Sequence, residues 1–182
     1  FAHGTGKCFK DTVAGAWGAA HRFEKDPIAA AQAEFARVCT LGREIGVDVG
    51  FGFESGGDPT TPGAKDLVRR RIAHIFKTYT DPQTLCVFQT EASGLYGWPT
   101  WAASPGYAEI HRKHAVTFRY LNRVPARQAE GVRAAEWFLF IYRVAKELRP
   151  SIRVAFSGWG GDLWMRGGDY WKGLHDILPA DA

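Results

Sequence analysis

A helical pattern, a short strand and a glycine-rich loop bearing an acid follow one another three times along this chain. The predicted strands cover residues 47–53, 85–90 and 152–156. Alternating helices and β-branched strands without hairpin signals indicate βα units and a parallel sheet. Because such connections are right-handed and ligands bind outside the carboxyl ends of parallel strands, we expect all three acid-bearing loops on one face.

Caps and apolar spacing define the helices. The first helix opens at Asp26 and Pro27, an acidic N-cap followed by proline at the first helical position, and Gly46 ends it. Its expected apolar stripe comprises Ile28, Ala31, Phe35, Val38 and Ile45. Further helices are predicted at residues 64–79, 107–123 and 126–148. The last one is apolar on nearly every side from Trp137 to Val144, which predicts that this stretch is buried.

The strand count sets the expected architecture. The 182 residues suit one domain with a substantial core, so residues 1–182 are treated as a single unit. A closed eight-stranded barrel takes about 250 residues, and rarely fewer than about 200. Residues 1–6 read as a loop leaving a strand, and residues 174–182 as a helix leading to another strand. We therefore expect an α/β fold of the parallel (β/α) TIM-barrel type, or a segment of such a barrel. A compact open α/β sheet is the alternative.

Composition and charge restrict the classes of partner that the chain is expected to bind. Hydrophobic residues make up 46% and charged residues 23%, which is typical of a globular domain. No apolar run approaches the roughly 18 residues of a membrane span, and the given segment holds no targeting signal. The net charge of +4 is spread among acids, and Arg69 and Arg70 are interpreted as a solvated helix face. Without a basic patch or a recognisable module, we expect no nucleic-acid partner.

Three acids follow the predicted strands directly or within a few residues: Glu54, Glu91 and Asp162. In a parallel barrel, acids at the carboxyl ends of strands point into the shared mouth, where catalytic groups gather. Glycoside hydrolysis uses two carboxyl groups, whose pKa values must be pushed apart so that one stays protonated. The alternative is that each acid caps a helix or binds an arginine. Glu91 is the best single catalytic candidate.

Aromatic residues gather in the same predicted loops: Tyr96, Trp98, Trp101, Trp159 and Trp164. Loop tryptophans flanked by glycine and proline expose large apolar planes, on which the C–H faces of sugar rings can stack. They are therefore predicted to bind substrate, and the alternative is that they pack long loops onto the barrel. His3, in the possible strand-end loop at the start, is added as a candidate for lining the site.

The sequence gives little indication of a metal site or of thiol chemistry. His111 and His114 are three apart on a predicted helix, but no third ligand of a zinc pattern accompanies them, so packing or surface roles are favoured over metal. Cys39 and Cys86 are interpreted as small buried hydrophobic residues, and a disulfide framework is not expected. No metal and no cofactor are therefore predicted.

The sequence contains no complete nucleotide-binding or serine-hydrolase motif. Residues 4–7 superficially resemble a P-loop, but its first glycine is missing and Cys8 replaces the magnesium-binding Ser or Thr. Gly50 and Gly52 are interpreted as sites where a neighbouring strand or side chain approaches closely. No Gly-x-Ser-x-Gly elbow surrounds Ser93 or Ser157.

Two short motifs carry a family resemblance. Residues 88–91, a hydrophobic strand ending in Glu91, resemble the strand-end acid of barrel glycoside hydrolases. Residues 156–162 (FSGWGGD) and 178–181 (LPAD) are similar to strand and helix-exit patterns of bacterial glycosidase barrels related to the hexosaminidase and α-glucuronidase families. As architecture, the resemblance covers residues 47–182.

The resemblance implies a barrel hydrolase that acts on a polysaccharide or glycoside without a redox cofactor. Glu91 would then be the proton donor, and Glu54 or Asp162 the second carboxylate or a ligand of sugar hydroxyls. The sequence departs from the hexosaminidase pattern, because Thr90 rather than an acid precedes Glu91. This argues against substrate-assisted chemistry on an N-acetyl group.

We therefore expect a glycoside hydrolase with a carbohydrate substrate. The first alternative is a non-catalytic sugar-binding or scaffold domain that keeps the aromatic face. The second is an open-sheet nucleotide-binding enzyme, which would be stabilised by phosphate-bearing ligands.

Overall fold

The computed structural model describes residues 2–3, 25–55, 59–89, 106–114, 125–158 and 175–180. The described elements are β1 (Ala2–His3), α2 (Pro27–Glu44), β2 (Gly50–Ser55), α3 (Ala64–Thr78), β3 (Thr84–Gln89), α5 (Tyr107–His114), α6 (Pro125–Leu148) and β4 (Arg153–Gly158). The fold is mixed α/β with a parallel sheet, as the sequence predicts. Each of the three predicted strands is present, displaced by at most three residues.

The strands run parallel in the order β1-β2-β3-β4. Each connection therefore leads to the adjacent strand, always in the same direction across the sheet. Register is unbroken from Gly50 opposite Thr84 to Ser55 opposite Gln89, and β3 pairs with β4 over its full length. Within the described residues the sheet is open, since β1 and β4 each pair along one edge.

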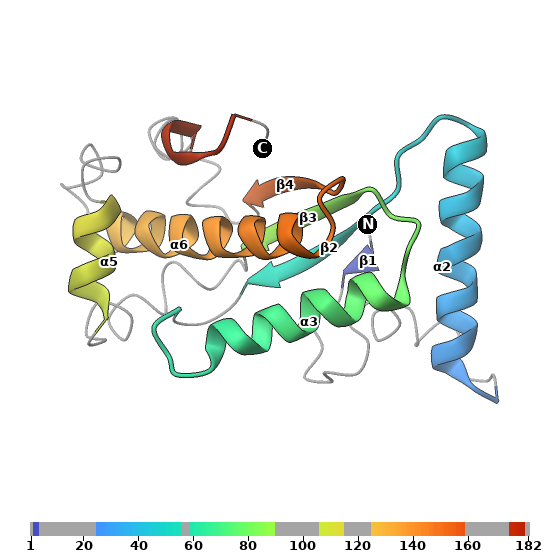
Figure 1. Ribbon diagram of the computed structural model, residues 1–182, viewed down its shortest axis with the longest axis horizontal. Helices are drawn as coiled ribbons and strands as arrows, with labels where there is room; N and C mark the ends of the chain where they lie inside the picture. Colours follow the sequence, from blue (N-terminus) through green and yellow to red (C-terminus); the bar gives the residue numbers. More distant parts are fainter. Residues whose placement is uncertain are drawn as a thin grey trace.

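The core lies between the sheet and two helices, α3 and α6, which Figure 1 shows on the same side of the strands. Leu85 and Val87 of β3 are fully buried and belong to the same hydrophobic cluster as Ile72 of α3 and Trp137 of α6. Trp137 is only 1% exposed. The predicted burial of the apolar stretch in α6 is thus confirmed. Burying one large apolar side chain contributes about 1.5–3 kcal/mol, so this layer fixes where β3 ends relative to both helices.

Helix α2 begins where the sequence predicts, but only part of its expected apolar stripe is buried. Asp26 Oδ1 accepts hydrogen bonds from the backbone N–H groups of Ile28 and Ala29 at 3.2 and 3.1 Å. Its contact with the core is made in the middle, where the Phe35 ring meets Tyr79 edge-on at 5.2 Å. Two residues of the expected apolar stripe, Ile28 and Ile45, do not join the core, because they are 45% and 65% exposed. Figure 1 shows the reason: α2 stands at one end of the molecule, beside the C-terminal end of α3.

At the amino-terminal edge of the sheet, the side chains of Arg149 and Asp48 form hydrogen bonds to neighbouring segments of the chain. The guanidinium of Arg149 donates to the backbone carbonyls of Phe76, Tyr79 and Pro82 at 2.7–3.0 Å, and it also lies over the Phe76 ring. Asp48 accepts a hydrogen bond from the Thr84 hydroxyl at 2.8 Å.

One glycine is required by close packing between strands. A Cβ atom on Gly50 would lie 2.8 Å from the carbonyl oxygen of Thr84. The predicted close approach of a neighbouring strand at Gly50 is therefore confirmed.

Candidate functional site

The carboxyl ends of β2, β3 and β4 form one row. Ser55 pairs with Gln89, and Gln89 pairs with Gly158, so the three strands end side by side. The chain segments that follow, residues 56–58, 90–105 and 159–174, all leave from this edge. It is the edge at which parallel α/β sheets bind their ligands.

Glu54 lies within β2 rather than after it. Its backbone pairs with Phe88, one residue before the strand ends at Ser55. The sequence places the end of this strand too early, because β2 continues through the acid into its last pairing with β3.

The other predicted site residues divide into two groups. His3 belongs to β1, where its backbone pairs with Gly52. The side chains of His3 and Glu54 lie outside the described part of the chain. Seven predicted residues lie entirely outside the described ranges: Glu91, Tyr96, Trp98, Trp101, Trp159, Asp162 and Trp164.

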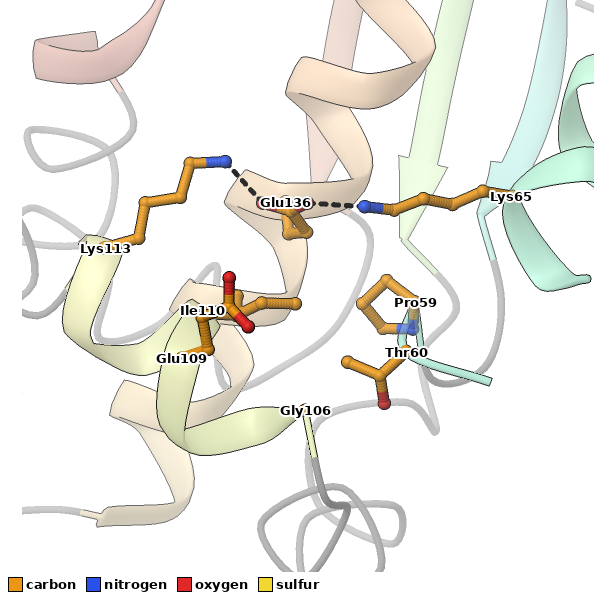
Figure 2. Close-up of a pocket in the computed structure, with 8 residues that line it drawn as sticks. All are labelled: Pro59, Thr60, Lys65, Gly106, Glu109, Ile110, Lys113 and Glu136. Atoms are coloured by element: carbon orange, nitrogen blue, oxygen red, sulfur yellow. Dashed lines mark hydrogen bonds and ion pairs between the residues drawn. The ribbon is translucent and has the colours of Figure 1, made fainter. Parts of the chain in front are cut away.

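A pocket of about 510 Å³ opens between the N-terminal ends of α3 and α5 and the adjoining part of α6. Figure 2 shows it near the heads of two strand arrows, at the carboxyl end of the sheet. Its wall consists of Pro59, Thr60, Lys65, Gly106, Glu109, Ile110, Lys113 and Glu136. Gly106 is needed here because a Cβ atom would come within 2.3 Å of the Thr60 methyl carbon.

Glu136 of α6 is the buried centre of this pocket. Its residue is 7% exposed, and its two carboxylate oxygens accept hydrogen bonds from Lys65 at 2.6 Å and Lys113 at 2.9 Å. His114, 2% exposed, lies with Nε2 3.3 Å from Oε2 of the same carboxylate. One carboxylate thus joins α3, α5 and α6, and Figure 2 shows the two lysines reaching it from opposite sides.

These partners keep Glu136 ionised. The hydrogen bond from His114, together with those from Lys65 and Lys113, holds the pKa of the Glu136 carboxyl well below its usual range, although burial opposes this shift. A carboxylate accepts hydrogen bonds but cannot donate one, so Nε2 of His114 carries the proton. Glu136 therefore serves as a fixed negative charge and not as a proton donor.

Three residues of this pocket were not predicted from the sequence: Glu136, Lys65 and Lys113. A signal was present for Glu136, since it is the lone acid directly before the apolar stretch that begins at Trp137. A buried acid needs a cationic partner, which the sequence does not identify because Lys65 lies 71 residues away.

His111 and His114 take packing roles, as favoured from the sequence. The His111 ring packs against that of Tyr107, with the ring centroids 5.2 Å apart and the planes tilted by 42°, while Nε2 of His114 lies 3.3 Å from the Glu136 carboxylate. In the described ranges no group of three His, Cys, Asp or Glu side chains could hold a metal ion. None of the helices described is long and apolar enough to cross a membrane.

Both described cysteines are buried, as predicted. Burial raises the pKa of the Cys39 and Cys86 thiols, so neither has the depressed pKa of an activated nucleophile.

Comparison with known proteins adds no relative. No protein-family model matches the chain, and the searches of curated proteins and of solved structures each gave no match.

Proposed function

We propose that this chain is the (β/α)-barrel catalytic unit, or a segment of one, of a glycoside hydrolase. Glu91 is the proposed proton donor, and Glu54 or Asp162 supplies the second carboxylate. The loop aromatic residues, among them Trp98 and Trp159, are the proposed platforms for sugar rings. No cofactor takes part in this scheme.

The observation that carries the proposal is the aligned edge formed by Ser55, Gln89 and Gly158. Glu91 comes two residues after Gln89 and Asp162 four residues after Gly158. An extended chain advances at most about 3.6 Å per residue, so these acids lie within about 7 and 14 Å of their strand ends. Glu54 is already at that edge. Three acids are thus tethered to adjacent points on the ligand-binding side of a parallel sheet.

The strand order supports the barrel over an open doubly wound sheet. An open sheet of that kind reverses its strand order at a switch point, and helices then cover both faces. In the described part, the strands instead follow the order β1-β2-β3-β4 without reversal. Figure 1 shows α3 and α6 on one side of these strands, the arrangement of a barrel with its helices outside.

In the proposed reaction, Glu91 in its protonated form gives its proton to the glycosidic oxygen as the bond to the anomeric carbon breaks. The second carboxylate either attacks the anomeric carbon or removes a proton from the attacking water. On the first route, water then hydrolyses the covalent intermediate and gives its proton to Glu91. On the second route, the proton of the water is left on the second carboxylate, and exchange with solvent restores both groups. Aromatic planes beside the strand ends would hold the rings in place during these steps.

The test is the substitution Glu91→Gln, measured by release of reducing sugar from a panel of polysaccharides and aryl glycosides. We expect turnover to fall by at least about 100-fold, because general acid catalysis contributes that much, while sugar binding is kept. The matched control is Glu44→Gln, an exposed glutamate at the end of α2, which should leave turnover unchanged.

Equal turnover in the Glu91→Gln variant and the unchanged chain would overturn the assignment. Saturable sugar binding with no product from either protein would instead favour a sugar-binding domain without catalysis.

A further inference from the structure

The pocket between α3, α5 and α6 has no part in the proposed chemistry. We infer that it binds one neutral sugar unit, as a subsite beside the strand-end site. This inference rests on the proposed function, because it takes the substrate to be a carbohydrate chain that extends away from the reacting bond.

Its position suits an extended substrate. Pro59 and Gly106 belong to the segments that connect the ends of β2 and β3 to α3 and α5. Pro59 comes four residues after Ser55, so the two Cα atoms are at most about 14 Å apart. The pocket therefore lies on the same side of the sheet as the strand-end acids.

Among the described residues, the wall of the pocket offers donors and acceptors with unused hydrogen-bonding capacity. Within the described ranges, Glu136 is the sole hydrogen-bond partner of Lys65 and of Lys113. Each ammonium has three N–H groups, so each lysine retains two donors. The carboxylate of Glu109, which Figure 2 shows beside the pocket, makes no ion pair or hydrogen bond with any described residue.

A sugar matches this set of groups. Its hydroxyl groups accept from the lysines and donate to Glu109, and charge-assisted bonds of this kind are stronger than neutral ones. The apolar C–H face of the ring can lie against Pro59 and Ile110. The volume of about 510 Å³ falls within the range of about 300–1,000 Å³ typical of small-molecule sites.

Charge balance selects a neutral ligand over an anion. Two cationic side chains, Lys65 and Lys113, face two acidic ones, Glu109 and Glu136. Since Glu136 stays ionised, an anionic ligand would meet as much repulsion as attraction. A neutral polyol can use all four groups without leaving a charge unbalanced.

The test is binding of glucose, xylose, cellobiose and xylobiose to the whole chain, followed by isothermal calorimetry and saturation-transfer NMR. Sodium glucuronate and inorganic phosphate are the anionic probes. We expect at least one neutral sugar to bind, and Glu109→Gln to weaken that binding about tenfold through loss of a charge-assisted hydrogen bond. Lys113→Gln should weaken it similarly.

Two matched controls lie away from the pocket. Glu44→Gln on α2 and Lys77→Gln on α3 remove one exposed charge each and should leave the Kd unchanged. Because Glu109 has no partner among the described residues, Glu109→Gln should also keep the thermal midpoint of the unchanged chain, which separates lost binding from lost folding.

Three results would overturn the inference: no binding of any of the neutral sugars, an unchanged Kd in the Glu109→Gln and Lys113→Gln variants, or tighter binding of glucuronate or phosphate. Failure of the proposed catalysis is a separate outcome. It would be seen as full turnover in Glu91→Gln, and Glu109-dependent sugar binding would still support the subsite.

Discussion

The two edges of the sheet use charged side chains in opposite ways. At the amino-terminal edge, Arg149 donates to three backbone carbonyls, and a second pocket there, of about 300 Å³, is lined in part by this arginine. At the carboxyl-terminal edge, Lys65 and Lys113 share one carboxylate and keep N–H groups for other partners. The first arrangement closes turns of the chain, while the second leaves hydrogen-bonding capacity facing a pocket.

This difference separates stability from ligand binding. A cation that donates to several backbone carbonyls stabilises the fold, and the donors used in this way are not available to a ligand. A cation pair held by one buried anion is both fixed in place and partly unsatisfied, which is the condition for a pre-organised binding surface. We therefore expect substitution of Arg149 at the amino-terminal edge to change unfolding alone, and removal of Lys65 and Lys113 at the carboxyl-terminal edge to change unfolding and binding together.

Removing both lysines tests the carboxyl-terminal edge most severely. The double substitution Lys65→Met with Lys113→Met leaves the Glu136 carboxylate buried, with His114 as its one remaining described partner. Breaking a buried ion pair in this way costs about 3–5 kcal/mol. We expect a loss of that size in the free energy of unfolding, measured by urea denaturation.

Adding Glu136→Leu to the double variant is its control. Replacing a whole buried ion group by apolar side chains is often neutral, so the triple variant should recover most of the lost stability while still failing to bind sugar. If the double variant is as stable as the unchanged chain, Glu136 is not held by these lysines and the description of this edge is wrong.

At the amino-terminal edge, Arg149→Met removes a guanidinium from the carbonyls of Phe76, Tyr79 and Pro82. Hydrogen bonds to charged groups contribute about 1.5–3 kcal/mol each. These three bonds are only partly buried, so we expect a total loss of about 2–3 kcal/mol. The Kd for sugar should not change. Arg149→Lys should lose part of this stability, because one ammonium cannot reproduce the planar fork of the guanidinium. A changed Kd in Arg149→Met would contradict the separation of the two edges.

Much of the fold could be predicted from local sequence signals. Asp26 and Pro27 start α2 where an N-cap and a first-turn proline are expected, and the apolar residues around Trp137 are buried. The signals failed where tertiary position decides the outcome. Ile45 continues the apolar spacing of α2 yet is 65% exposed, since this helix packs at one end of the molecule and touches the core mainly through Phe35.

The site was predictable only in part, for a different reason. The placement of strand ends on one edge follows from the βα pattern, and the register of Ser55 with Gln89 agrees with it. The cluster around Glu136 depends on side chains far apart in the chain, with Lys65 on one helix and Lys113 on another. Neither periodicity nor a motif encodes such a pairing, so a lone acid beside an apolar stretch was the one available sign.

Acid should weaken the two edges unequally. The partners of Glu136 lower the pKa of its carboxyl, so the folded chain binds fewer protons there than the unfolded chain, whose glutamates titrate near about 4.3. The resulting stabilisation is complete above that pH and is lost as the pH falls toward the lower folded value. Between about pH 5 and pH 3 this amounts to about 1–2 kcal/mol, since each pH step below about 4.3 costs up to about 1.4 kcal/mol. Urea denaturation across this range should therefore show a shallower decline in the free energy of unfolding for Glu136→Gln than for the unchanged chain.

The Arg149 contacts use backbone carbonyls, which do not titrate. Arg149→Met should therefore lower the free energy of unfolding by the same amount at both ends of this pH range. A parallel decline in the unchanged chain and Glu136→Gln would show that the buried carboxylate is not the acid-sensitive group of this fold.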